Sequence, residues 1–280
     1  MNKNNHFHLL GAVIATGILS FSGVLIETAM NVTFPTLINE FGLSTSKIQW
    51  VTTIYLLVIA ITIPLSSYFN ERFSARKLFL IANLFFLVGV LTNCFSANFV
   101  MLLFGRLLQG IGTGIGLPLM IHLILTKAPL HKRGMMMGIG TLTTSIAPAI
   151  GPTYGGIISN SLDWRYIYIF LLPLVVISLV LGLACLPREG EKTPKKLALR
   201  PVIALSIMFF AFISALSAEH LMTFALLFIV GLVGAFLFVQ FNRKESLIDL
   251  GILKNHRFVA LIFSLLVYQA LLLGLSFVLP

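Results

Sequence analysis

Long stretches without a charged side chain most restrict how this chain can fold. Residues 48–70, 134–162 and 166–187 contain no Asp, Glu, Lys or Arg. Each can cross a hydrocarbon core of about 30 Å as a helix, which needs about 20 apolar residues and satisfies its own backbone. Of the 280 residues, 58% are hydrophobic and only 10% are charged, too few to cover a soluble protein of this length. The sequence therefore predicts an all-α polytopic membrane protein, not a soluble enzyme, a nucleic-acid-binding domain or a disulfide scaffold.

We predict about nine transmembrane helices. The apolar region 78–125 is too long for one crossing, and the polar cluster Ser96-Ala97-Asn98 marks a turn within it. The first span differs from the apolar core of a signal peptide, because it is long, contains Glu27 and is followed by further spans. The predicted spans cover residues 9–30, 48–69, 78–95, 99–125, 135–159, 166–186, 201–218, 221–241 and 258–279.

The basic residues predict the orientation of these spans. Sixteen of the 19 Lys and Arg residues lie before the first span or in the connections that follow the second, fourth, sixth and eighth spans. Only Lys47 and Arg165 fall on the opposite side, and Arg106 lies within a span. By the positive-inside rule, the N-terminus is cytoplasmic. The net charge of +10 therefore reflects topology, so we expect the lipid bilayer, and no nucleic acid, as a partner.

A carboxylate inside the first predicted span is the first candidate site residue. Burying Glu27 at membrane depth costs on the order of a few kcal/mol, and such residues mark functional sites. Glu27 can bind and release a proton as its surroundings alternate. Asn31, one turn later, can share its hydrogen bonds. The alternative is a carboxylate that simply reaches water near the outer interface, since Pro35 marks the expected end of the span.

An arginine in the fourth span is the second candidate. Arg106 lies about 10 Å into that span at 1.5 Å per residue. Because arginine stays charged, its predicted role is electrostatic: it acts on a nearby carboxylate or holds a water-filled cavity. Gln109 and the glycines that follow it indicate a packed polar seam. The alternative is a side chain that snorkels to the outer headgroups.

The fifth predicted span combines prolines and glycines, and we expect it to bend or rock. Pro148 and Pro152 each remove a backbone hydrogen bond, which bends a helix. Glycines four residues apart let a neighbouring helix approach closely. The glycines for which we expect such close packing are Gly134, Gly138, Gly151, Gly155 and Gly156.

The cytoplasmic connection between the second and third spans is the last candidate, and we name residues 70–77 the latch loop. Its charged residues are Glu71, Arg72, Arg76 and Lys77. They can pair with helix ends on the inner face and act as a latch. The alternative is an ordinary positive-inside loop.

Together these elements resemble the major facilitator superfamily, specifically its fourteen-helix drug:proton antiporter branch. Residues 106–110 are similar to the family's fourth-helix motif, and residues 151–156 to its fifth-helix antiporter motif. Residues 27–35 resemble the first-helix signature, with Glu in place of the more usual Asp. Residues 163–165 resemble the Trp-Arg pair that opens the sixth helix. In the latch loop, Ala75 replaces a glycine of the family pattern.

The resemblance implies a domain organisation. Its parts are a six-helix N-terminal half at 1–187, a cytoplasmic loop at 188–200, two additional helices within 201–241, a second cytoplasmic loop at 242–257 and the first helix of a second half at 258–280. An alternating-access site lies between two halves, so the expected partner is a second transporter half, further along the polypeptide or in another chain. The apolar end at Pro280 and the odd number of spans favour a truncated polypeptide.

The resemblance also implies a function: proton-driven export of lipophilic or cationic small molecules across the cytoplasmic membrane of a bacterium by alternating access. Glu27 and Arg106 would couple the proton, and the fifth span would bend between conformations. The driving force is the proton gradient, without a cofactor. Cys94 and Cys185 lie in separate apolar runs without metal-ligand or redox spacing, so we predict packing roles for both and no metal site.

Two other functions stay open at this point. A facilitator that takes up a nutrient would share the fold and differ in direction. A non-transporting membrane protein, such as a sensor or an inactive fragment, belongs to a different class. An enzyme is disfavoured, because no predicted loop offers a nucleophile–base pair, a metal cluster or a phosphate-binding loop.

Overall fold

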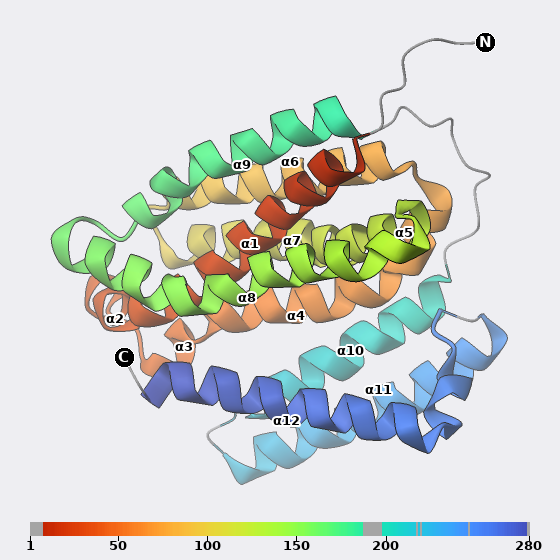
Figure 1. The fold of residues 1–280 in the computed structure, drawn as a ribbon. Coiled ribbons are helices and arrows are strands. Elements are labelled where there is room, and N and C mark those ends of the chain that lie inside the picture. The colour runs from red at the N-terminus through yellow and green to blue at the C-terminus, as the bar shows by residue number, and fades with distance from the viewer. Residues whose placement is uncertain (1–7, 187–197, 217, 219, 246, 279–280) are drawn as a thin grey trace.

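Every regular element in the described part of this protein is a helix. The structure is a computed structural model that describes residues 8–186, 198–216, 218, 220–245 and 247–278 (Figure 1). The helices are α1 (Leu9–Val32), α2 (Phe34–Phe41), α3 (Thr45–Ile48), α4 (Trp50–Thr62), η1 (Ile63–Leu65), α5 (Ser66–Arg72), α6 (Ala75–Cys94), α7 (Phe99–Lys127), α8 (Leu130–Ser161), α9 (Tyr166–Cys185), α10 (Leu199–Leu216), α11 (Leu221–Lys244), η2 (Leu250–Lys254) and α12 (His256–Val278). The predicted all-α class is confirmed.

The long helical segments correspond to the predicted spans. Within the described residues, seven segments are long and apolar enough to cross a membrane: α1, the segment from α3 to α5, α6, α7, α9, α10 and α11. The 32-residue α8 is long enough, but its glycines, threonines and prolines make it less apolar. Residues 256–271 of α12 form a shorter apolar helix. With α8 and α12 included, the segments agree with the predicted count of about nine.

The second span is not one continuous α-helix. α4 ends at Thr62, the 3₁₀ segment η1 follows, and α5 begins at Ser66. Pro64 lies inside η1. A proline ring clashes with the preceding turn and has no N–H to donate, so the helix changes its hydrogen-bonding pattern there. The predicted span at 48–69 is confirmed, because the segment from Thr45 to Arg72 is long and apolar enough to cross a membrane.

α1 runs through the middle of the bundle (Figure 1). It packs against α7, α8 and α9, while α6 packs on α7 and α9, and α4 packs on α7. At the α6–α7 crossing, a Cβ built on Gly89 would lie 2.6 Å from the carbonyl oxygen of Gly105. Only glycine lets the two backbones come this close. These contacts bring α1, α4 and α7 together, and the candidate polar residues Glu27 and Asn31 lie on α1, with Arg106 and Gln109 on α7.

α10 and α11 form a hairpin beside this bundle (Figure 1). α10 contacts α4, where the rings of Trp50 and Phe210 lie 6.2 Å apart between centroids. Within the hairpin, a Cβ on Gly231 would lie 2.7 Å from the ring of Phe212. The described side chains of α12, to Leu271, are exposed. The hairpin therefore joins the bundle through α10.

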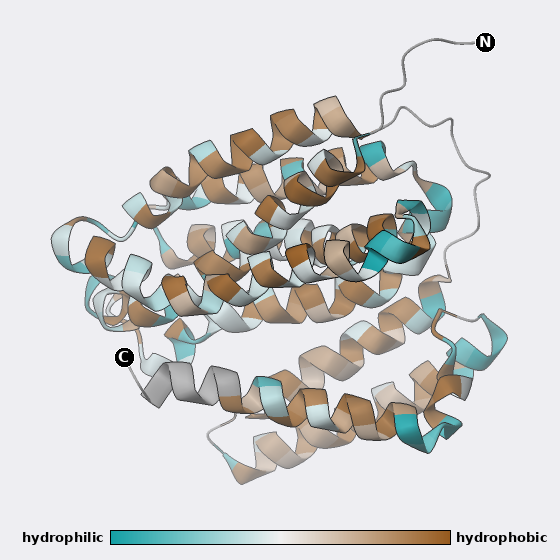
Figure 2. Ribbon diagram, viewed as in Figure 1, coloured by the Kyte–Doolittle hydropathy of each residue, from teal (hydrophilic) through white to brown (hydrophobic). Residues whose placement is uncertain are grey.

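The distribution of polarity fits a bundle solvated by lipid. Large apolar side chains are exposed along the outer faces of the helices, among them Val100, Phe104 and Phe236. Figure 2 shows hydrophilic residues gathered at helix ends, including the end where α5 meets α6. Lys3 and most of the predicted loop 188–200 lie outside the described residues. The described polarity is that of a multi-pass membrane protein.

Candidate functional site

The carboxylate of Glu27 lies among the central helices without a hydrogen-bond partner. Other polar side chains of α1 satisfy themselves: the Thr28 hydroxyl donates to the Val24 carbonyl at 3.0 Å. An ionised carboxylate has no proton to donate to such a carbonyl. Glu27 is only 9% exposed, and it makes no hydrogen bond with the described residues. It interacts electrostatically with Arg106. The bundle covers most of the side chain, and the alternative of a carboxylate that reaches water near the outer interface stays open.

Arg106 is the buried positive charge of the site. It is 0% exposed, so the alternative of a side chain snorkelling to the headgroups is wrong. Its Nε donates to the carbonyl of Val51 on α4 at 2.9 Å, and its Nη1 donates to Oε1 of Gln109 at 3.1 Å. Its Cζ lies 4.2 Å from the ring centroid of Tyr55. Three groups on α4 and α7 thus contact one buried guanidinium.

The seam around Arg106 contains further buried polar groups. Nη2 of Arg106, Nε2 of Gln109, both amide atoms of Asn93 and the hydroxyl of Tyr168 have no hydrogen-bond partner of normal geometry in the described part of the chain. Interior polar groups normally find partners, and exceptions concentrate at functional sites. The structure therefore confirms the predicted polar seam and extends it to α6 and α9.

Asn31 does not join this seam. Its Oδ1 accepts a hydrogen bond from the Thr52 hydroxyl at 2.9 Å, which links α1 to α4. The expectation that Asn31 shares hydrogen bonds with Glu27 was wrong, because no bond joins them in the described structure. Asn31 lies one turn beyond Glu27, where α4 offers a closer donor.

The glycine-rich part of α8 packs against α1 next to Glu27. A Cβ built on Gly151 would lie 2.9 Å from Cβ of Thr28, and one on Gly155 would lie 2.9 Å from Cα of Ala29. A Cβ on Gly156 would make only ordinary contact with Val32, at 3.8 Å. The predicted close approach is thus confirmed at Gly151 and Gly155.

The other glycine pair of α8 has no such contact. Among the described residues, a Cβ on Gly134 or Gly138 would meet no heavy atom within 4 Å, so the close approach expected at this pair was wrong. Pro148 and Pro152 lie inside one continuous helix assignment from Leu130 to Ser161. Bending of α8 stays a prediction.

Gly155→Val should loosen the α1–α8 contact, because two new methyl groups would meet the Ala29 backbone. Overpacking of this kind costs about 1–3 kcal/mol or more. Gly138→Val is the matched control on the same helix, and its effect should stay within about 0.5 kcal/mol. The melting temperature of each variant is measured in detergent, with labelling of the buried thiol of Cys94 as the signal of unfolding. Equal melting temperatures for the two variants would contradict the assigned α1–α8 contact.

The latch loop contacts neighbouring helix ends at one end of the bundle. Nη1 of Arg76 donates to the Leu186 carbonyl, just beyond α9, at 3.3 Å. Arg72 donates to the Tyr68 hydroxyl, and its Cζ lies 5.6 Å from the ring centroid of Phe73. Lys77 also faces the Phe73 ring, at 5.4 Å. Pairing with a helix end is therefore confirmed for Arg76; the latch itself stays a prediction.

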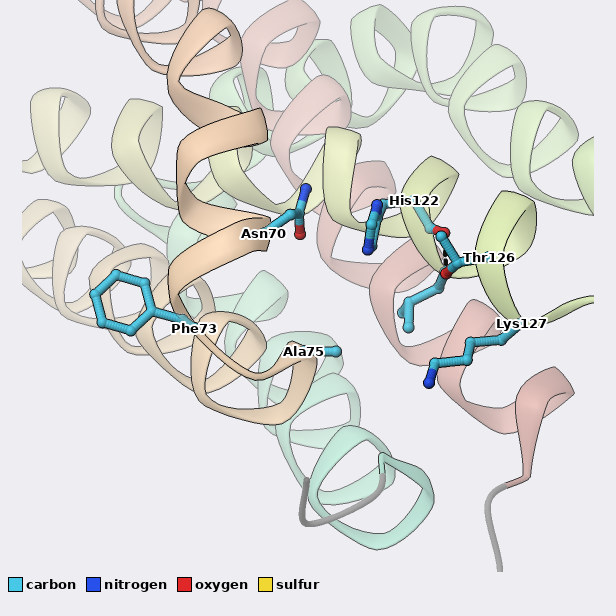
Figure 3. Close-up of a pocket in the computed structure, with 7 residues that line it drawn as sticks. Asn70, Phe73, Ala75, His122, Thr126 and Lys127 are labelled. Carbon is cyan, nitrogen blue, oxygen red and sulfur yellow. Dashed lines mark hydrogen bonds between the residues drawn. The ribbon is translucent and has the colours of Figure 1, made fainter. Parts of the chain in front are cut away.

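Two adjoining cavities lie between the latch loop and α7. One, of about 260 Å³, includes Asn70, Phe73, His122 and Lys127 in its lining, and the other, of about 500 Å³, includes Glu71. Figure 3 shows Asn70 and His122 pointing toward each other across the first cavity. In the described residues, no group of three or more His, Cys, Asp or Glu side chains could hold a metal ion. The cavities therefore lie beside the latch loop and are lined by both polar and apolar side chains.

A cluster at the opposite end of the bundle was not predicted. Nη2 of Arg165 donates to Glu40 at 2.8 Å and to the Ser96 carbonyl at 2.7 Å. Nε1 of Trp164 donates to the other oxygen of Glu40 at 2.5 Å. Burial opposes the charge of Arg165, but hydrogen bonds and attraction from Glu40 and Asp163 raise its pKa. The cluster ties three connections together, and the adjacent Trp164 and Arg165 were the only sequence signal for it.

A bundle of long apolar helices with a buried carboxylate and a buried arginine among its central helices defines a polytopic membrane protein with charged groups in its interior. A family model described as the Major Facilitator Superfamily matches residues 16–280. The chain belongs to this superfamily, and it is a multi-pass plasma-membrane protein. The resemblance inferred from the motifs is confirmed.

Curated relatives and solved structures agree with this assignment. The lincomycin resistance protein LmrB of Bacillus subtilis is 32% identical over 286 residues, covering 99% of this chain and 60% of that protein. The multidrug export protein EmrB of Escherichia coli is 32% identical over 183 residues, 65% of this chain and 36% of that protein. The human organic anion transporter MFSD10 has the same fold, with a TM-score of 0.57 at 13% identity over 83% of this chain and 72% of its own. The chain spans about three-fifths of the length of LmrB.

Proposed function

We propose that this protein exports lipophilic or cationic small molecules across the cytoplasmic membrane in exchange for protons. The observation that carries the proposal is the buried pair of Glu27 and Arg106, which interact electrostatically without a direct hydrogen bond between them. A carboxylate in this setting changes its charge when a proton arrives, and the arginine beside it does not. The names of LmrB and EmrB support drugs as the substrate class. The proton gradient is the driving force, and no cofactor takes part.

Exchange requires that the proton and the substrate favour opposite conformations. A proton on Glu27 removes its attraction to Arg106, which changes the relative energies of the arrangements of α1 and α7. α8 follows α1, because Gly151 and Gly155 pack directly against Thr28 and Ala29. We therefore assign to α8 the bending movement and to the latch loop, with Glu71, Arg72, Arg76 and Lys77, the closing of the inner side. The second half that completes the substrate site is a further partner in this proposal.

Ethidium, a fluorescent lipophilic cation, tests the function in inside-out membrane vesicles that contain the protein. Acidification of the lumen should drive ethidium into the vesicles, and nigericin, which collapses the pH gradient, should stop it. Movement of ethidium out of an acidic lumen, together with protons, would instead indicate an uptake transporter. No ethidium movement and no drug-induced proton release would favour a non-transporting sensor.

The same vesicles also test the need for a second half. Activity of the chain should appear, or rise, when the C-terminal part of the Bacillus subtilis relative is co-expressed. Equal activity without it would show that copies of this chain complete the site for one another.

A further inference from the structure

We infer that Tyr55 is a positioning residue, which holds the Arg106 guanidinium in place for Glu27 through its aromatic ring; the inference rests on the proposed function. Tyr55 lies on α4 and is 0% exposed. Its ring centroid lies 4.2 Å from Cζ of Arg106. An aromatic face attracts a cation within about 6 Å, and the attraction is stronger where water is excluded. The ring of Tyr55 thus packs directly against the buried guanidinium.

The hydroxyl of Tyr55 orients that ring. It donates to Oγ1 of Thr113 on α7 at 3.0 Å, seven residues after Arg106 on the same helix. The tyrosine therefore touches α7 at two points, the guanidinium and the threonine. Two contacts on one helix fix the ring more firmly than either would alone, because the side chain has few rotatable bonds.

Tyr55 also touches α1 on the face that carries Glu27. A Cβ built on Gly23 would lie 2.8 Å from the Tyr55 hydroxyl oxygen and 2.7 Å from Cγ2 of Thr113. Residues four apart lie on the same face of a helix, so Gly23 and Glu27 share this face. Tyr55 lies within electrostatic reach of both Glu27 and Arg106. Its position therefore sets how closely α1 brings the carboxylate to the guanidinium.

The chemistry of a ring suits this role better than a second carboxylate would. A carboxylate beside Arg106 would form a permanent ion pair and compete with Glu27. An aromatic face stabilises the cation without taking up a proton at working pH, and it leaves Nη2 of Arg106 without a hydrogen bond of normal geometry in the described structure. The guanidinium thus keeps a donor that a second carboxylate would occupy, while it acts electrostatically on Glu27.

Three variants separate the ring from the hydroxyl. Tyr55→Phe keeps the ring and loses the bond to Thr113, while Tyr55→Leu and the longer Tyr55→Met lose both. Ethidium transport by Tyr55→Phe should stay within about threefold of the native rate with the same pH profile. Transport by Tyr55→Leu and Tyr55→Met should fall about tenfold or more, and the pH profile should shift by at least about half a unit. Phe79→Leu, which removes a buried ring elsewhere in the core, should leave the pH profile unchanged.

A spectroscopic measurement tests the inference even if the protein transports nothing. The ring current of Tyr55 shifts the ¹⁵N and ¹H signals of Arg106 Nε in purified protein, and Arg106→Lys assigns these signals. Tyr55→Phe should keep the shifted signals, and the ringless variants should lose them. Unchanged signals in Tyr55→Leu or Tyr55→Met, or an unchanged pH profile, would overturn the inference. A shift of the pH profile in Tyr55→Phe as large as in the ringless variants would also overturn the inference, because the hydroxyl would then be the group that positions Arg106.

Discussion

Glu27→Gln should abolish proton-linked export while leaving membrane insertion intact. The amide has nearly the shape of the carboxyl group but cannot release a proton, so a proton gradient can no longer act through this position. Insertion should not suffer, because the substitution removes a costly charge from the membrane interior. Acid-driven accumulation of ethidium in inside-out vesicles should fall to the level of vesicles without the protein.

Glu245→Gln is the matched control for this result. Glu245 is exposed just beyond the end of α11, so the loss of its carboxylate should leave transport unchanged. Drug-induced proton release from the same vesicles gives a second measure of coupling. Full proton-coupled transport by Glu27→Gln would remove Glu27 from the mechanism.

Arg106→Ala should also abolish proton-linked export, for a different reason. The alanine leaves the Val51 carbonyl, Gln109 Oε1 and the Tyr55 ring without the group that now occupies the space between them. Glu27 then loses the positive charge of Arg106, which attracts its ionised form and not its protonated form. We expect ethidium accumulation at background level at every lumen pH, with the protein still present in the membrane.

Arg106→Lys separates charge from geometry. An ammonium keeps the charge, but it lacks the planar fork that donates to Val51 and Gln109 at once. Transport should therefore be reduced but measurable. The control is Arg243→Ala on the exposed end of α11, which should transport normally. Proton-coupled transport by Arg106→Ala at the native rate would exclude Arg106 from coupling.

Much of the fold could be predicted because the membrane imposes local requirements. A segment that crosses lipid must be a helix of about 20 apolar residues, and both its length and its polarity are written in consecutive residues. The break at Pro64 shows the limit of such reasoning. The proline was visible in the sequence, but only the surrounding contacts determine whether a helix bends, breaks or changes to a 3₁₀ turn there.

The candidate site was predictable in part for the same reason. Glu27 and Arg106 stand out because a charge within an apolar run is rare, whatever lies around it. Tyr55 has no such signal, because a tyrosine in an apolar helix is ordinary. Its role becomes visible only when α4 brings it against a guanidinium 51 positions further along the chain.

The sequence by itself determined that the chain is a helical membrane protein with two charged residues within its apolar spans, and it predicts the orientation of those spans. Tertiary structure decided what those charges contact, and which of two equally spaced glycine pairs is a helix contact. Gly151 and Gly155 pack against α1, whereas a Cβ at Gly134 or Gly138 would meet no heavy atom of the described residues within 4 Å. The hydrophobicity of a span and the hydrogen bonds of its backbone depend on that segment alone. Contacts between side chains depend on how separate helices cross, which only the tertiary structure shows.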